Sequence, residues 1–164
     1  QSRFDSSAQE FSLVFAVTTL GMILGNQVNA FLIGRVEIYR RLFLGLGGSI
    51  VSVTSLTVLD AFGGASLVTV TAALFVMMVF TGLVSPNATA LALDGQSPKV
   101  AGSGSALLGT MQFGIGSALA STAGLAGPVT LSSMTTVMLA TAVGAAVVFT
   151  GFSLRLRRTP LVAA

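Results

Sequence analysis

The residues of this chain that could act on another molecule are uncharged amides inside long apolar stretches. Asn29, Asn87 and Gln112 are the main examples, and Met111 lies beside Gln112. An amide in hydrocarbon must find a hydrogen-bond partner or face a water-filled cavity. Two interpretations therefore stay open for each amide: an interhelical hydrogen bond, or a cavity that binds a small molecule. Gln112 is the best cavity candidate, because Met111 and Phe113 suit a pocket for varied apolar ligands.

Other kinds of chemistry lack their parts in this sequence. It has no cysteine and no histidine, and its few carboxylates lie near the ends of the apolar stretches. The sequence therefore lacks the residues for nucleophilic and general acid–base catalysis. It also lacks the commonest metal ligands and a phosphate-binding loop. We expect no enzyme activity, no cofactor and no metal. We also expect no buried basic residue, and no proton-carrying group within these residues.

The elements that position these amides are expected to be membrane helices. Only 8% of the 164 residues are charged, against about 25% in a soluble domain, and the mean hydropathy is +0.92. Uncharged stretches long enough to cross a bilayer need roughly 20 residues. The pattern predicts an all-α integral membrane bundle, a single domain of about five helices near residues 11–33, 42–59, 65–93, 101–126 and 129–154.

Basic residues gather in alternate connections. The first connection carries a short motif that we expect in the cytoplasm, formed by Gly34, Arg35, Arg40 and Arg41. Lys99 and the basic C-terminal segment fall on the same predicted side. By the positive-inside rule the N-terminal end of this chain faces out and its C-terminus faces the cytoplasm. Short connections also predict that helices adjacent in sequence are antiparallel neighbours.

Two local patterns predict how helices meet or bend. Gly21 and Gly25 form a small-residue pair with Asn29 one turn later on the same face, as at close helix contacts in membranes. Similar pairs occur in the fourth and fifth expected helices, and some of them are expected at helix contacts: Ser105 with Gly109, Gly116 with Ala120, and Ala140 with Gly144. Pro86 removes a backbone hydrogen bond, so we expect a kink near Ser85. Such a kink can be static or can permit rocking.

Several segments together resemble one transporter family. They are similar to the bicyclomycin-resistance (Bcr/CflA) group of drug:proton antiporters, which belongs to the major facilitator superfamily. The matching segments run in order along nearly the whole chain and comprise residues 7–12, 25–30, 40–42, 86–93, 101–109 and 112–113.

The resemblance implies the C-terminal half of a twelve-helix transporter, without the first six helices and most or all of the seventh. It implies alternating access, small amphipathic drug-like substrates, a plasma-membrane location, a missing N-terminal half as partner and a proton site outside this chain. It also implies that the first, third and fourth helices here face the central cavity, which favours Gln112 and Asn87. The alternatives are a transporter for a specific metabolite and a small non-transporting membrane protein or partner subunit. Nucleic acid is not expected, because no aromatic residues accompany a basic patch.

Overall fold

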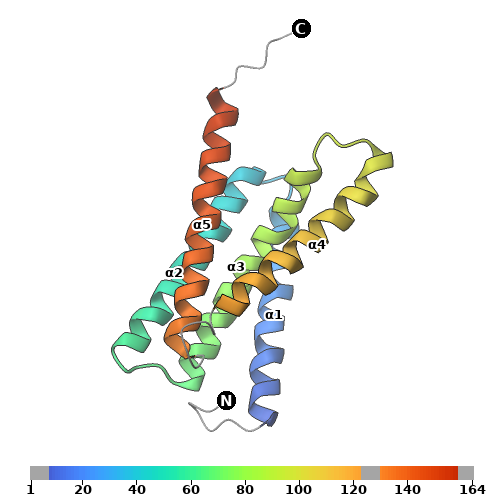
Figure 1. Cartoon of the computed structure of the whole chain (residues 1–164). Coiled ribbons are helices and arrows are strands. Elements are labelled where there is room, and N and C mark those ends of the chain that lie inside the picture. Colours follow the sequence, from blue (N-terminus) through green and yellow to red (C-terminus); the bar gives the residue numbers. More distant parts are fainter. Residues whose placement is uncertain (1–7, 123–129, 159–164) are drawn as a thin grey trace.

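The described part of the chain consists of helices joined by short turns. The computed structural model describes residues 8–122 and 130–158. Within them lie five helices: α1 (Ala8–Leu32), α2 (Ile38–Ala61), α3 (Leu67–Leu93), α4 (Pro98–Thr122) and α5 (Leu131–Arg158) (Figure 1). The all-α bundle predicted from the sequence is confirmed. The predicted ends at 123–126 and 129 lie outside the described residues.

Local residue chemistry explains where the helices stop and start. Gly34, Gly63 and Gly95 have positive φ angles of 80°, 71° and 72°, a region that glycine adopts without steric cost. Each follows the end of a helix, as glycine commonly does. Ser66 begins α3 with a capping box, in which its side chain accepts from the Thr69 backbone amide. These turns keep the connections short.

Four of the helices, α1, α2, α3 and α5, are long and apolar enough to cross a membrane. Among the described residues α4 does not reach the same apolarity, although it has 25 residues. The reason is its composition, because the run Gly102-Ser103-Gly104-Ser105 replaces the aliphatic residues found elsewhere. The molecule is therefore a membrane-spanning helical bundle, and a fifth crossing by α4 stays a prediction.

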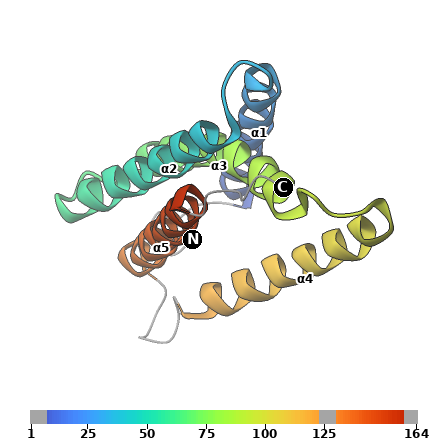
Figure 2. The same cartoon turned by 90° about the horizontal axis from the view of Figure 1, so that it is seen from above.

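The helices do not pack in chain order. α3 is central: α1 and α2 both pack along it, and α5 packs on α2, whereas α4 has few contacts with the rest. α1 runs parallel to α3, and α2 runs antiparallel to it (Figures 1 and 2). The expectation that neighbours in sequence would pack side by side is thus wrong for α1 and α2. Glycine positions decided the pairing instead.

Glycines bring α1 and α3 into close contact. A Cβ atom at Gly21 would lie 2.6 Å from the backbone oxygen of Phe75, and one at Gly25 would lie 2.0 Å from that of Val79. From the other side, a Cβ at Gly82 would lie 2.7 Å from the oxygen of Met22. No side chain fits at these three positions without displacing a backbone. The predicted role of Gly21 and Gly25 in a close helix contact is confirmed. Among the described residues, a Cβ at Gly109, Gly116 or Gly144 would meet nothing within 4 Å, so these glycines make no such contact.

The apolar core lies between α2 and α3. Its most buried side chains are Leu42, Val53, Leu56 and Leu83, each no more than 5% exposed. Lipid is as apolar as these side chains, so burial between helices adds little hydrophobic drive there. Shape and hydrogen bonding then decide which helices associate.

α5 is held against α2 by aromatic rings. Phe149 lies 5.0 Å from the ring of Phe43 in an edge-to-face arrangement and 6.0 Å from the ring of Tyr39 in a stacked one. Both distances fall in the range that favours aromatic pairs. The contact joins the first turns of α2 to the C-terminal part of α5.

The connections alternate between the two ends of the bundle. The α1–α2 and α3–α4 connections lie at the same end as the C-terminal end of α5, opposite the start of α1 (Figure 1). The basic segments predicted to share one side therefore do share one end of the molecule. Which side of a membrane this end faces stays a prediction.

Candidate functional site

A buried polar cluster joins α1, α2 and α3 near the basic end of the bundle. The side-chain oxygen of Asn29 accepts hydrogen bonds from Arg41 Nη1 at 3.0 Å and from Asn87 Nδ2 at 2.6 Å. Asn87 Nδ2 also donates to the Leu83 carbonyl at 2.6 Å. Asn29, Arg41 and Asn87 are 5%, 7% and 3% exposed. For Asn29 and Asn87 the structure shows the interhelical hydrogen bond, one of the two interpretations that the sequence left open.

Arg41 overturns the expectation that no basic residue is buried. The tight turn after α1 brings the first turn of α2 back over the end of α1, so Arg41 points inward. Its Nε donates to the Val36 carbonyl at 3.1 Å, besides the bond to Asn29. Among the described residues no carboxylate forms an ion pair with it. Oxygen dipoles rather than a counter-ion therefore compensate this guanidinium.

The rest of the basic loop motif is at the surface. Arg35 stacks over the Phe31 ring, with its guanidinium carbon 4.1 Å from the ring centroid, and donates to the Phe31 carbonyl. Arg40 lies 3.8 Å from a Glu37 oxygen, with both side chains 78% exposed. An exposed pair of this kind contributes little to stability. The motif therefore divides into one buried arginine and two surface arginines.

Gln112 and Met111 line a groove between α3 and α4. The groove has a volume of about 500 Å³ and includes Val84, Ser85 and Ala88 on the α3 side. A second hollow of about 380 Å³ shares Ala92 and Leu108 with it and extends toward the α3–α4 connection. Both volumes fall within the range of small-molecule sites, roughly 300–1,000 Å³.

The candidate residues of the buried cluster and those of the groove thus lie on different faces of α3. Asn87 faces α1 and is buried, whereas Ser85 and Ala88 line the groove toward α4. Pro86 lies between them, inside a helix that continues to Leu93. Pro86 removes the backbone bond to Gly82, and the kink expected near Ser85 stays a prediction.

Sequence reasoning missed Arg41 as a member of the buried cluster. It stands next to Arg40 in the sequence, and the two look alike as loop charges. The available signal was helical position, because neighbouring residues on a helix point about 100° apart. Two consecutive arginines therefore point in different directions, and one of them can face a neighbouring helix while the other faces out.

These features define the class of protein as a membrane-spanning helical bundle with a buried Arg–Asn–Asn cluster and a groove beside it. No protein-family model, no curated protein and no solved structure matches the chain.

Proposed function

We propose that this chain is part of a multidrug efflux transporter of the plasma membrane, which moves small amphipathic compounds outward by alternating access and is coupled to proton entry. The observation that carries the proposal is the groove between α3 and α4, where the Gln112 amide and a few hydroxyl groups lie among apolar side chains. The family resemblance of the sequence supports the same function.

The groove has the chemistry that varied amphipathic compounds require. Met111, Leu108 and Ile115 offer flexible or apolar contact, and methionine adapts readily to differently shaped ligands. The Gln112 amide has no hydrogen-bond partner among the described residues. It is thus available to one polar group of a ligand. A mostly apolar lining with a few polar groups is the usual form of a small-molecule site.

The packing also supports a moving part. α1, α2 and α3 form one closely packed unit, while α4 contacts α3 and α5 only lightly and lies to one side of that unit (Figure 2). Alternating access requires that one group of helices move against another around the site. A lightly packed α4 that carries Gln112 and Met111 allows the groove to change width.

The proton is carried elsewhere under this proposal. The described carboxylates Glu10, Glu37, Asp60 and Asp94 lie at or near helix ends rather than inside an apolar span. Secondary transporters carry protons on ionisable groups within the membrane. We therefore place the proton site in a separate N-terminal half, which is the expected partner of this chain.

The test is dye efflux from cells that lack their own drug pumps. The gene product is expressed as it occurs naturally, and the mass of the native polypeptide extracted from membranes is compared with 16.6 kDa. Wild-type protein should lower the retention of a fluorescent amphipathic dye, and a protonophore should abolish the effect.

Matched variants connect the efflux to the groove. Gln112→Ala should raise dye retention several-fold. Thr110→Ala, whose hydroxyl donates within α4 to Ala106, should leave it unchanged. Wild-type cells that retain as much dye as cells with an empty vector would refute the proposed function. Equal effects of the two variants would instead remove the groove assignment.

A further inference from the structure

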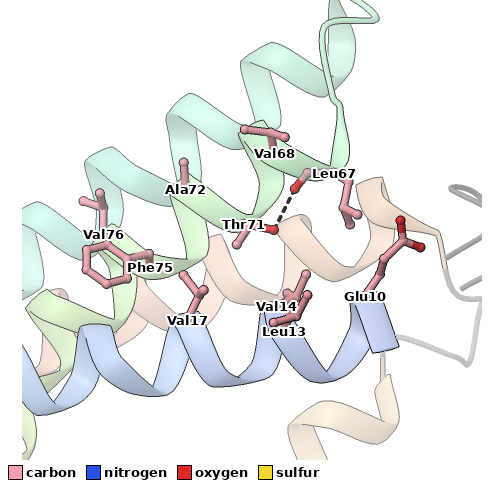
Figure 3. Close-up of a pocket in the computed structure, with 10 residues that line it drawn as sticks. All are labelled: Glu10, Leu13, Val14, Val17, Leu67, Val68, Thr71, Ala72, Phe75 and Val76. Atoms are coloured by element: carbon pink, nitrogen blue, oxygen red, sulfur yellow. Dashed lines mark hydrogen bonds between the residues drawn. The ribbon is translucent and has the colours of Figure 1, made fainter. Parts of the chain in front are cut away.

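A second groove lies between α1 and α3, at the end of the bundle opposite Arg35, Arg40 and Arg41. Its volume is about 540 Å³, within the range of small-molecule sites. Figure 3 shows Glu10 at one end of a row of apolar side chains contributed by both helices. The α1 side comprises Leu13, Val14 and Val17, and the α3 side comprises Leu67, Val68, Thr71, Ala72, Phe75 and Val76.

The groove forms where the glycines of α1 give way to larger residues. Further along α1, Gly21 and Gly25 let the two backbones meet. One and two turns earlier the same stripe carries Val17 and Val14, whose side chains hold the backbones apart. The helices are therefore joined at one end of their contact and spaced at the other. The groove is a built-in consequence of this change in residue size.

The polar character of the groove is concentrated at one point. Thr71 is the other polar residue in the lining, and its hydroxyl already donates to the Leu67 carbonyl at 2.7 Å. Glu10 is the charged residue of the lining. A carboxylate has about four acceptor positions on its two oxygens, so Glu10 can engage another cation alongside its interactions within the protein.

We propose that this groove binds a monocationic amphiphile, an alkyl chain that ends in an ammonium group. The chain lies along the apolar side chains of α1 and α3, and the ammonium lies beside the Glu10 carboxylate. The α3 part of the lining spans ten residues, from Leu67 to Val76, or roughly 14 Å along the axis. A single extended alkyl chain of similar length can lie along this lining.

Charge decides which amphiphile binds. Lipid tails are as apolar as the groove, so an apolar chain alone gains little by leaving the bilayer. A carboxylate at the end of the groove favours a positive headgroup and repels a negative one. A zwitterionic phospholipid brings a phosphate together with its amine, so a simple ammonium is the better match.

Binding can be tested at equilibrium, independently of any transport. The full chain is placed in phosphatidylcholine nanodiscs with a dodecylammonium probe that carries a photoreactive group on its tail, and the labelled peptides are identified by mass spectrometry. Labelling should fall on residues 10–17 and 67–76. Excess dodecyltrimethylammonium should compete, whereas dodecyl phosphate and dodecyl maltoside should not.

Variants then separate attraction of the probe to the Glu10 charge from non-specific partitioning of its alkyl chain. Glu10→Gln should weaken labelling about five-fold, as expected for one partly exposed ion pair. Glu37→Gln removes an exposed carboxylate at the other end of the bundle and should change nothing. Equal labelling of wild type and Glu10→Gln, or equal competition by the neutral amphiphile, would overturn the proposal. Loss of labelling in phosphatidylethanolamine nanodiscs would overturn the choice of a free amphiphile over a lipid amine.

Discussion

The side chains of Asn29 and Asn87 meet at 2.6 Å across α1 and α3, although they are 58 positions apart in the chain. The same Asn29 oxygen also receives Arg41, so one atom joins three helices. Hydrogen bonds between membrane helices contribute about 0.6–2 kcal/mol each. The cluster therefore stabilises the association of α1, α2 and α3, next to the glycine contacts that hold α1 on α3.

Asn29→Ala should destabilise the bundle more than a similar change one turn away. The substitution removes the hydrogen bonds from Arg41 and Asn87 to the Asn29 oxygen, and it leaves Arg41 with the Val36 carbonyl as its acceptor. The expected loss of unfolding free energy is about 2–4 kcal/mol. Asn26→Ala is the matched control, because Asn26 is exposed on the same helix. Thermal unfolding of the purified chain in a mild detergent measures the difference. Equal midpoints for the two variants would show that the cluster carries no stability.

Arg41 and Asn29 should be energetically coupled. Arg41→Met alone removes a buried charge but leaves the Asn29 amide without that donor, while Asn29→Leu alone leaves the charge less compensated. The double variant should therefore be more stable than the sum of the single losses predicts, by about 1–2 kcal/mol. A double-mutant cycle on unfolding free energies measures this coupling. Strict additivity would contradict the arrangement of the cluster.

Gly25→Ala should separate α1 from α3. The added methyl group would lie 2.0 Å from the backbone oxygen of Val79, and overpacking of this kind costs about 1–3 kcal/mol or more. Gly47→Ala is the control, since its Cβ meets nothing within 4 Å and alanine is the better helix former. The control should be neutral or stabilising in the same unfolding measurement. A tolerated Gly25→Ala would mean that the helices do not meet there.

The orientation in the membrane can be tested with single cysteines, because the chain has none of its own. Glu37→Cys lies in the basic α1–α2 connection, and Phe62→Cys lies at the opposite end, where Phe62 is 86% exposed. By the positive-inside rule, a membrane-impermeant thiol reagent should label position 62 in intact cells and position 37 only after lysis. The reverse pattern would invert the topology.

Composition and periodicity were sufficient to predict the helical membrane class, because long uncharged stretches allow few other structures in lipid. They also predicted the close contact of Gly21 and Gly25, since small residues four positions apart share a helix face. In the part of the chain that the structure describes, the helices begin and end within a few residues of the limits expected from local sequence. Glycine at Gly34 and the cap at Ser66 act through neighbouring atoms only.

The tertiary structure decided which helix each face meets. Ser52 looks like any small residue of α2, yet it donates to the Ala73 carbonyl of α3 at 2.6 Å. Arg40 and Arg41 are identical in type and adjacent in sequence, yet one is at the surface and the other is buried. Such differences arise because a partner across a helix interface is chosen by backbone approach and side-chain shape. Those quantities depend on residues far away in the chain, as Asn29 and Asn87 do, and local sequence does not contain them.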